Sequence, residues 1–230
     1  MQVLEIYQSK QGEGLWTGRF SVFVRLVGCP LRCRYCDTVQ ARNDENEENI
    51  GADLSPDEIV GRVMLLDLHH IVITGGEPMV SDEIVELTHA LKEFDYQITI
   101  ETSGVQFQPV LCDLISISPK LTNSNPMNNE EALQQHSQYQ YNHDAIQQLI
   151  LRYNYQLKFV VDTLDDLQEI NEYLSQFHGI VPERVLLMPQ AIDTETMAKK
   201  AAWIQPHCDE NGYRYCPRMQ LVWYGHQKRT

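Results

Sequence analysis

Residues 21–36 read SVFVRLVGCPLRCRYC, in which an apolar, β-branched run leads directly into three cysteines. Residues 21–28 have the length and composition of a buried β-strand. The cysteines therefore lie in the loop that leaves the carboxyl end of this strand. Ligands of mainly parallel sheets gather at that edge, so this stretch predicts both a sheet and the place of a site.

The same order of strand, loop and helix recurs along the chain. The predicted strands, all with apolar and β-branched cores, are 21–28, 70–76, 96–104, 111–119, 157–162 and 184–190. The predicted helices are about 56–68, 82–94, 164–177 and 195–205. The first helix opens on Ser55-Pro56-Asp57-Glu58, a capping box with proline at the first helical position. Such alternation predicts an α/β fold on a mainly parallel sheet.

Two polar segments interrupt this order. Residues 40–53 are acidic and rich in asparagine, which predicts a solvated loop. Residues 122–143 are rich in asparagine and glutamine and lack apolar periodicity. We interpret the second segment as a polar insertion on the scaffold.

Composition limits the class of protein. The 230 residues, 43% of them hydrophobic, suffice for one domain over 1–230 with a buried core. The formal charge of −14 argues against a nucleic-acid partner, because gripping phosphates requires clustered Lys and Arg. No stretch approaches the roughly 20 apolar residues of a membrane span, and residues 1–14 lack the regions of a signal peptide. We therefore expect a cytoplasmic protein with no membrane partner.

The spacing Cys29-x3-Cys33-x2-Cys36 favours an iron–sulfur cluster. Three thiolates from one curled loop can hold three corners of a [4Fe–4S] cubane and leave the fourth iron open. Arg32 and Arg34 lie between the cysteines and favour their thiolate forms. A zinc knuckle or a redox-sensing thiol group is the alternative. Zinc sites usually have four ligands, however, and no second cysteine pair or nearby histidine completes this one.

The remaining cysteines are scattered. Crowding of the first three into one loop argues against a disulfide framework. No spacing that is typical of a metal site links the others to it. We interpret them as reduced thiols without a metal role: Cys112, Cys208 and Cys216.

Two features together resemble the radical S-adenosylmethionine superfamily. The first is the cysteine spacing, with Tyr35 directly before the last cysteine. The second is ITGGEP (73–78), which is similar to that superfamily's glycine-rich strand end. Gly75 and Gly76 lack a Cβ and so permit a cofactor to approach the backbone closely. GGEP by itself is also an ordinary turn, and its position one strand after the cysteine loop makes it informative.

Further motifs resemble one family within that superfamily, 7-carboxy-7-deazaguanine synthase, which makes an early intermediate of queuosine and other deazapurine nucleosides. The specific motifs are QGEG (11–14) and Cys36-Asp37-Thr38. The others are Gly18, FVRLVGC (23–29), ETSG (101–104), SISPK (116–120), LKFVV (157–161) and LVWYG (221–225). Together they touch almost the whole chain apart from the two polar segments.

The resemblance implies a partial (β/α)6 TIM-like barrel that works as a homodimer. It implies a carbon–nitrogen lyase that converts 6-carboxy-5,6,7,8-tetrahydropterin to 7-carboxy-7-deazaguanine with release of ammonia. The implied cofactors are a [4Fe–4S] cluster, S-adenosylmethionine and Mg²⁺. The implied protein partner is a reducing electron-transfer protein such as flavodoxin or ferredoxin.

The resemblance also assigns candidate roles to residues. Thr38 is the candidate magnesium ligand, with Asp37 orienting the metal's shell, because this cation prefers oxygen. Arg25 offers a planar fork for the substrate carboxylate. The candidate cluster ligands are Cys29, Cys33 and Cys36. The candidate cofactor-binding residues are Tyr35, Gly75, Gly76, Glu77, Thr102, Ser103, Ser118, Lys120 and Gln190. The candidate substrate-binding residues are Gln11, Glu13, Gly14, Arg25 and Gly75. No catalytic acid or base is assigned.

Each assignment has an alternative. Arg25 also suits a surface ion pair, Thr38 a turn and Glu13 a solvated loop, while the polar strand ends also suit helix caps. The chain departs from the family at Gln220, because the family often has a histidine shortly before its terminal Trp-Gly block. Glutamine can donate or accept a hydrogen bond but cannot carry a proton as imidazole does.

Two other functions stay open at this point. A glycyl-radical activating enzyme has the same cysteine loop, but it needs an open face for a partner's loop and has no reason for QGEG or Asp37-Thr38. A non-catalytic iron–sulfur or zinc protein needs no ligand cavity. The polar residues that follow three of the predicted strands indicate such a cavity.

Overall fold

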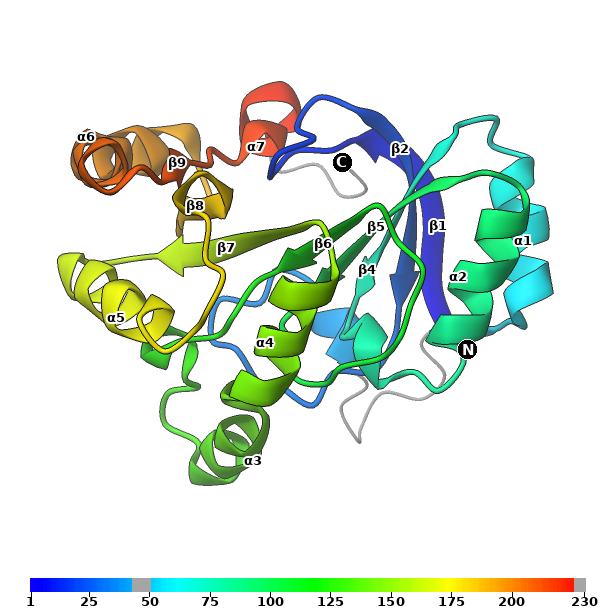
Figure 1. Cartoon of the computed structure of the whole chain (residues 1–230), viewed down its shortest axis with the longest axis horizontal. Coiled ribbons are helices and arrows are strands. Elements are labelled where there is room, and N and C mark those ends of the chain that lie inside the picture. The colour runs from blue at the N-terminus through cyan, green and yellow to red at the C-terminus, as the bar shows by residue number, and fades with distance from the viewer. Residues whose placement is uncertain (43–50, 226–230) are drawn as a thin grey trace.

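The computed structural model describes residues 1–42 and 51–225. Within them, one sheet runs in the order β3-β1-β2-β4-β5-β6-β7-β8-β9 and stays open, because its edge strands β3 and β9 do not pair with each other (Figure 1). Neighbouring strands from β2 to β9 are parallel, whereas β1 pairs antiparallel with β2 and β3. The strands are β1 (Gln2–Lys10), β2 (Phe20–Leu26), β3 (Ala52–Asp53), β4 (His70–Gly75), β5 (Gln97–Thr102), β6 (Leu114–Ile117), β7 (Tyr155–Val161), β8 (Val185–Pro189) and β9 (Arg214–Tyr215).

Helices connect the parallel strands and flank the sheet (Figure 1). They are α1 (Pro56–Met64), α2 (Ile84–Glu93), α3 (Glu130–Gln140), α4 (His143–Arg152), α5 (Leu164–Leu174), α6 (Thr194–Asn211) and α7 (Met219–Tyr224). Short 3-10 turns are η1 (Val39–Arg42), η2 (Pro78–Val80), η3 (Thr122–Ser124) and η4 (Pro182–Arg184). None of the described helices is long and apolar enough to cross a membrane.

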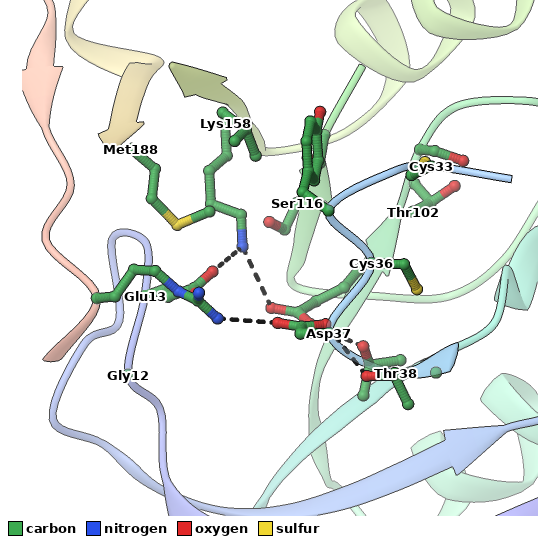
Figure 2. Close-up of a pocket in the computed structure, with 18 of the residues that line it drawn as sticks. Gly12, Glu13, Cys33, Cys36, Asp37, Thr38, Thr102, Ser116, Lys158 and Met188 are labelled. Atoms are coloured by element: carbon green, nitrogen blue, oxygen red, sulfur yellow. Dashed lines mark hydrogen bonds and ion pairs between the residues drawn. The ribbon is translucent and has the colours of Figure 1, made fainter. Parts of the chain in front are cut away.

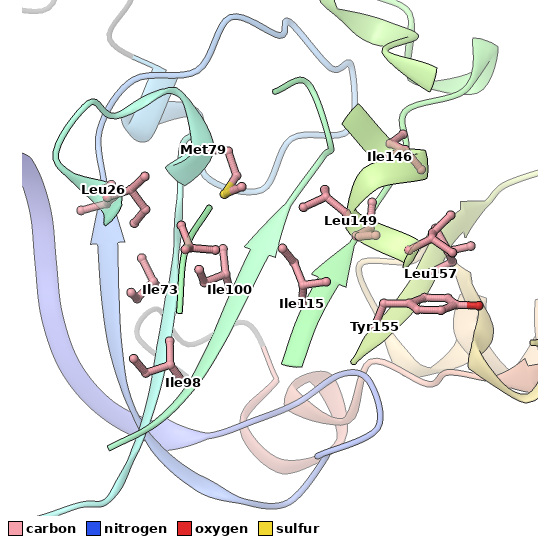
Figure 3. Close-up of a cluster of buried hydrophobic side chains, with 14 of the residues drawn as sticks. Leu26, Ile73, Met79, Ile98, Ile100, Ile115, Ile146, Leu149, Tyr155 and Leu157 are labelled. Carbon is pink, nitrogen blue, oxygen red and sulfur yellow. The ribbon is translucent and has the colours of Figure 1, made fainter. Parts of the chain in front are cut away.

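The core lies between the sheet and the helices that cover it. Ile73, Ile98, Ile100 and Ile115 of the central strands are fully buried, and Figure 3 shows them in one cluster with Leu149 of α4. Burying an aliphatic side chain of this size contributes roughly 1.5–3 kcal/mol. The continuous apolar runs in the sequence therefore correspond to strands that are buried on both faces.

The predicted partial barrel is confirmed. All six predicted strands are present, as β2, β4, β5, β6, β7 and β8, and four predicted helices are α1, α2, α5 and α6. The capping box of Ser55 and Glu58 has both of its reciprocal hydrogen bonds. Helix α6 is longer than predicted because it continues past Pro206 to Asn211, and the left-handed φ of 71° at the next residue, Gly212, ends it.

The predicted polar insertion contains structure that the sequence pattern did not reveal. Residues 122–143 form η3 and α3, and α4 follows directly. Helix α3 was missed because its face toward the protein carries His136 and Gln140, which are polar but buried. Strand β1 was missed because its side chains alternate only weakly between buried and exposed. Of the predicted loop 40–53, residues 43–50 lie outside the described part of the chain.

Candidate active site

A cavity of about 290 Å³ opens at the carboxyl edge of the parallel strands. Its walls come from strand ends, from the cysteine loop after β2, from the turn between β1 and β2 and from the start of α7. Figure 2 shows Cys33 and Cys36 on one side of this pocket and Glu13 and Lys158 on another. The short loops after successive parallel strands thus bring together residues that are distant in sequence.

The three candidate cluster ligands line this cavity. Cys33 is buried, Cys29 and Cys36 are half-buried, and all three are free thiols. Burial, reinforced by the charge of Glu77, raises the pKa of the Cys29 thiol to about 12. Burial also raises the pKa of Cys33, against the nearby charges of Lys120 and Arg42. Iron binding must therefore displace thiol protons, as metal binding to cysteine generally does.

Arg32 and Arg34 donate hydrogen bonds to backbone carbonyls near the cysteines. Arg34 donates to the carbonyl of Asn123 at 2.6 Å and pairs with Asp162 at 2.6 Å. Arg32 donates from Nη1 to the carbonyl of Cys29 at 2.8 Å. Arg32 thus binds the backbone of the cysteine loop itself, and Arg34 ties that loop to Asn123 and Asp162. Among the largest influences on the pKa of Cys33, the cations that lower it are Lys120 and Arg42.

Two glycines at the end of β4, Gly75 and Gly76, are required by the close approach of the backbone that follows β2 toward the cysteines. A Cβ on Gly76 would lie 2.1 Å from the carbonyl oxygen of Gly28. A Cβ on Gly75, whose φ is 121°, would lie 2.3 Å from the carbonyl oxygen of Leu26. These positions exclude any side chain. The glycines therefore hold the end of β4 against the strand that leads to the cysteines.

Glu77 joins the ends of two strands. It is 2% exposed, and its Oε1 accepts hydrogen bonds from the backbone N–H of Met79 at 3.1 Å and from Thr102 Oγ1 at 2.6 Å. Its Oε2 accepts from the backbone N–H of Ser103 at 2.7 Å and from the Ser103 hydroxyl. Glu77, Thr102 and Ser103 all line the cavity, but their polar groups are largely engaged with one another.

The other candidate cofactor-binding residues also line the cavity. Lys120 donates from Nζ to Ser118 Oγ at 2.8 Å and to the Ser118 carbonyl at 2.6 Å. Tyr35 donates to Asn123 Oδ1 at 3.3 Å. Gln190 lies at the end of β8, where its backbone N–H donates to Val161 at 2.7 Å. These residues form a polar rim beside the cysteines.

A buried ion-pair network forms the opposite wall. Glu13 Oε2 accepts from Lys158 Nζ at 2.6 Å (Figure 2). Glu13 Oε1 accepts from Arg218 Nε at 3.2 Å and from Gln220 Nε2 at 2.5 Å. Burial alone would raise the pKa of the Glu13 carboxyl. The charges of Lys158 and Arg218 outweigh burial and lower this pKa to about 2. Glu13 is therefore an ionised carboxylate whose side chain is only 15% exposed, and not a solvated loop residue.

Glu101 adjoins this network. Its Oε1 lies 3.9 Å from Lys158 Nζ and accepts from Gln11 Nε2 at 3.3 Å, and its Oε2 accepts from Thr74 at 2.8 Å. Burial alone would lower the pKa of Lys158, but Glu13 and Glu101 raise it. Lys158 is therefore a fixed positive charge in the cavity wall.

Arg25 and Thr38 lie together below the cysteine loop. Arg25 donates to Glu5 at 2.9 Å, to the Tyr7 hydroxyl at 2.8 Å and to Thr38 Oγ1 at 3.3 Å. Thr38 donates to Asp37 Oδ1 at 3.2 Å, and Asp37 Oδ2 accepts from Arg218 at 2.8 Å. Arg25 thus has an internal ion pair, and it still lines the cavity.

The structure brings nearly all the predicted site residues to one cavity, and Gly14 is the exception. Gly14 does not line the cavity. It has a left-handed φ of 85°, and a Cβ there would lie 2.4 Å from the side chain of Gln156. Its backbone N–H lies 3.2 Å from Cys216 Sγ. Gly14 therefore shapes the turn that carries Glu13.

Sequence reasoning missed several residues of the cavity wall. One signal was available, since Lys158 is a single charge within the apolar strand LKFVV and Glu101 ends another such strand. Buried charges of this kind are usually paired. Other missed residues carry no comparable signal, among them Tyr7, Lys10, Thr74, Ser116, Met188 and Arg218.

The residues fit a [4Fe–4S] cluster and a nucleoside cofactor. Within residues 1–42 and 51–225, no three His, Cys, Asp or Glu side chains are arranged to hold a single metal ion. A cubane does not require this, because each cysteine binds a different iron. Three free thiols on one cavity, with a polar rim beside them, supply the donors that such a group needs.

Three cysteines on one loop beside polar strand ends, at the carboxyl edge of a parallel sheet, are the arrangement of radical S-adenosylmethionine enzymes. Residues 23–120 match the radical SAM superfamily. The chain belongs, more narrowly, to the 7-carboxy-7-deazaguanine synthase family. It is 37% identical to 7-carboxy-7-deazaguanine synthase of Rhodopirellula baltica, over 99% of this chain and 88% of that protein. It is 32% identical to the synthase of Halobacterium salinarum, over 100% of this chain and 93% of that protein.

Solved structures agree with the fold. The crystal structure of QueE from Escherichia coli is 24% identical and superposes with a TM-score of 0.72, over 95% of this chain and 93% of that chain. Streptococcus suis SuiB bound to S-adenosylmethionine superposes with a TM-score of 0.51 at 11% identity, over 87% of this chain and 48% of that chain.

Proposed function

We propose that this chain converts 6-carboxy-5,6,7,8-tetrahydropterin to 7-carboxy-7-deazaguanine with release of ammonia. The observation that carries the proposal is the single cavity that has three free cysteines on one side and the Glu13–Lys158 network on the other. A non-catalytic cluster protein has no need of this cavity. A glycyl-radical activating enzyme has no need of a buried network that matches a small polar ring.

The cysteine side of the cavity holds the cofactors. Cys29, Cys33 and Cys36 would ligate the [4Fe–4S] cluster, and the polar rim would bind S-adenosylmethionine. When bound, these groups supply the 5′-deoxyadenosyl radical that removes a hydrogen atom from the substrate. Glu77 acts indirectly, since its hydrogen bonds fix Thr102 and Ser103 at the strand end.

The charged side of the cavity binds the substrate ring. The ionised Glu13 accepts hydrogen bonds from the N–H groups of the pterin, and Gln11 and Gln220 flank it. Gln220 Oε1 is buried and has no hydrogen-bond partner among the described residues, so it is available to a ring N–H. Three of the five N–H groups of Arg25 have internal partners, and the others face a substrate carboxylate.

Magnesium binds only together with substrate in this proposal. Thr38 and Asp37 offer oxygen ligands, but the guanidinium groups of Arg25 and Arg218 contact them. Two adjacent cations oppose a free Mg²⁺ ion. Anionic oxygens of the substrate offset this repulsion and complete the shell of a metal that takes few protein ligands.

Further features of the assembly complete the proposal. Residues 1–230 form one radical SAM domain, supported by the single sheet that runs from β3 to β9. The enzyme is a cytoplasmic homodimer that receives electrons from a flavodoxin or ferredoxin.

The test is anaerobic reconstitution with iron and sulfide, followed by incubation with reductant, S-adenosylmethionine, Mg²⁺ and the carboxypterin. Release of ammonia together with carboxydeazaguanine, in equal amounts, is the expected result. Cleavage of S-adenosylmethionine without either product would refute the proposed substrate but retain the cofactors. A matched control is Glu13→Gln, which removes the charge but keeps the shape and should lower turnover without lowering iron content.

A further inference from the structure

The insertion at 122–143 contains a buried histidine that contacts the cysteine loop. His136 is 0% exposed, although most of α3 is exposed. Its Nδ1 accepts a hydrogen bond from the backbone N–H of Arg32 at 3.0 Å. Arg32 lies between Cys29 and Cys33. This bond therefore joins the insertion to the segment between two cluster ligands.

The contacts of His136 fix its tautomer. The backbone N–H of Arg32 can only donate, so Nδ1 must be the unprotonated nitrogen. Nε2 lies 2.9 Å from Ser124 Oγ, and the Ser124 hydroxyl donates to the carbonyl of Leu121 at 2.6 Å. In this series of hydrogen bonds every donor has an acceptor when the imidazole is neutral and carries its proton on Nε2.

The insertion is itself anchored to the sheet. The backbone N–H of Arg34 donates to the Ser124 carbonyl at 2.9 Å, next to the Arg32 contact. Asn123 Nδ2 donates to the carbonyl of Val160 in β7 at 2.8 Å. Gln140 of α3 donates to the carbonyl of Leu121 at 2.7 Å. The cysteine loop is therefore hydrogen-bonded to a segment of the insertion that is in turn hydrogen-bonded to β7.

We propose that His136 is a positioning residue for the cluster. Its hydrogen bond to Arg32 holds the segment between Cys29 and Cys33 in the conformation that presents both thiols to the cavity. His136 does not line the cavity and acts through the backbone. The inference rests on the proposed function for the identity of the group that the thiols bind, whereas the contact itself is present in the protein without that group.

Two substitutions distinguish the role of Nδ1 of His136 from that of Nε2. In His136→Asn, the side-chain oxygen can take the place of Nδ1 and accept from Arg32. In His136→Gln, the longer amide lies nearer the position of Nε2 and loses the Arg32 contact. The matched control is His70→Gln, because His70 is also buried, 2% exposed, and bonds through both nitrogens to Ser21 and Thr99, away from the cavity.

Two measurements test the proposal. The first is hydrogen exchange of the Arg32 amide in the protein without a cluster. The second is the rate at which a chelator removes iron from the reconstituted protein. Leaving the partly buried N–H of Arg32 without its acceptor should raise both rates roughly tenfold in His136→Gln. Both rates should stay near those of the wild type in His136→Asn, and His70→Gln should lower thermal stability without changing either.

Equal behaviour of the Asn and Gln variants would overturn the proposal, as would unchanged Arg32 exchange in His136→Gln. A wild-type protein that takes up no iron would instead refute the proposed function. In that case the exchange of the Arg32 amide still decides whether His136 supports the loop.

Discussion

Replacing Lys158 by Met tests the ion-pair network on the side of the cavity where we propose that the substrate binds. The side chains of Lys158 and Glu13 are 8% and 15% exposed, and Nζ lies 2.6 Å from Oε2. Methionine keeps the volume of lysine and removes the charge, so the change isolates the ion pair. The variant leaves Glu13 with Arg218 and Gln220 as partners.

The magnitude follows from the pKa of Glu13. A pKa of about 2 in the folded protein, against an ordinary value of 4.5, corresponds to about 3 kcal/mol of stability at neutral pH. This contribution is present above pH 5 and is lost as the pH falls toward 2, because the folded state resists protonation of Glu13. Lys158 is the largest of the causes that lower the pKa, so Lys158→Met should cost about 2 kcal/mol.

The assay is urea unfolding of Lys158→Met, Glu13→Gln and the double variant at pH 7. The double variant should be more stable than the sum of the two single losses predicts, by about 1–2 kcal/mol, because each single variant already loses the whole Lys158–Glu13 attraction, which the double variant loses only once. Losses that add within about 0.5 kcal/mol would show that the two residues are not energetically coupled, and the network would then not be the electrostatic unit described above.

Four further outcomes are expected. Cys36→Ala should abolish the charge-transfer absorption of the reconstituted cluster. Replacing Cys112, Cys208 and Cys216 together by serine should leave the iron content unchanged, as measured by iron analysis. Thr38→Ala should reduce turnover and its Mg²⁺ dependence while leaving S-adenosylmethionine binding intact, and an unaltered Mg²⁺ titration would contradict the metal assignment. Arg25→Ala should weaken carboxypterin binding much more than S-adenosylmethionine binding in calorimetry, unless Arg25 serves only its ion pair with Glu5, in which case both affinities fall together. Burial, assisted by Arg19 and opposed by Asp113, lowers the pKa of His70 from 6.5 to about 4. The melting temperature should therefore fall from pH 7 to pH 5, because the unfolded chain takes up the proton and the folded chain does not. His70→Gln should reduce that fall.

The sequence predicted those parts of the fold in which local pattern and tertiary environment agree. The strand HIVITG, for example, has the unbroken apolar run Ile71 to Ile73, which predicts its burial on both faces. The insertion was different, because His136 and Gln140 are buried through hydrogen bonds and not through apolar contact. Hydrophobic periodicity cannot detect a buried face of that kind.

The parts of the site that consist of a sequence motif were predictable. The parts that depend on ion pairs between residues distant in sequence were not. The cysteine spacing and GGEP lie at consecutive strand ends, so parallel topology alone brings them together. Glu13 and Lys158 are 145 positions apart and meet only because the turn after β1 folds over β7. No local signal reports such a pair, although a lone lysine in an apolar strand indicates that a partner exists.

The four hydrogen bonds accepted by Glu77 bear on how tightly a cofactor can bind. Ordering a flexible residue costs roughly 1–2 kcal/mol of backbone entropy, and a strand-end loop that ordered only on binding would subtract that cost from affinity. Here Met79, Thr102 and Ser103 are already held by one carboxylate in the free protein. The entropy of these residues is therefore lost during folding, and the strand end is preorganised for its ligand. Substituting Glu77 should accordingly weaken cofactor affinity through added disorder, even though its carboxylate need not touch the cofactor.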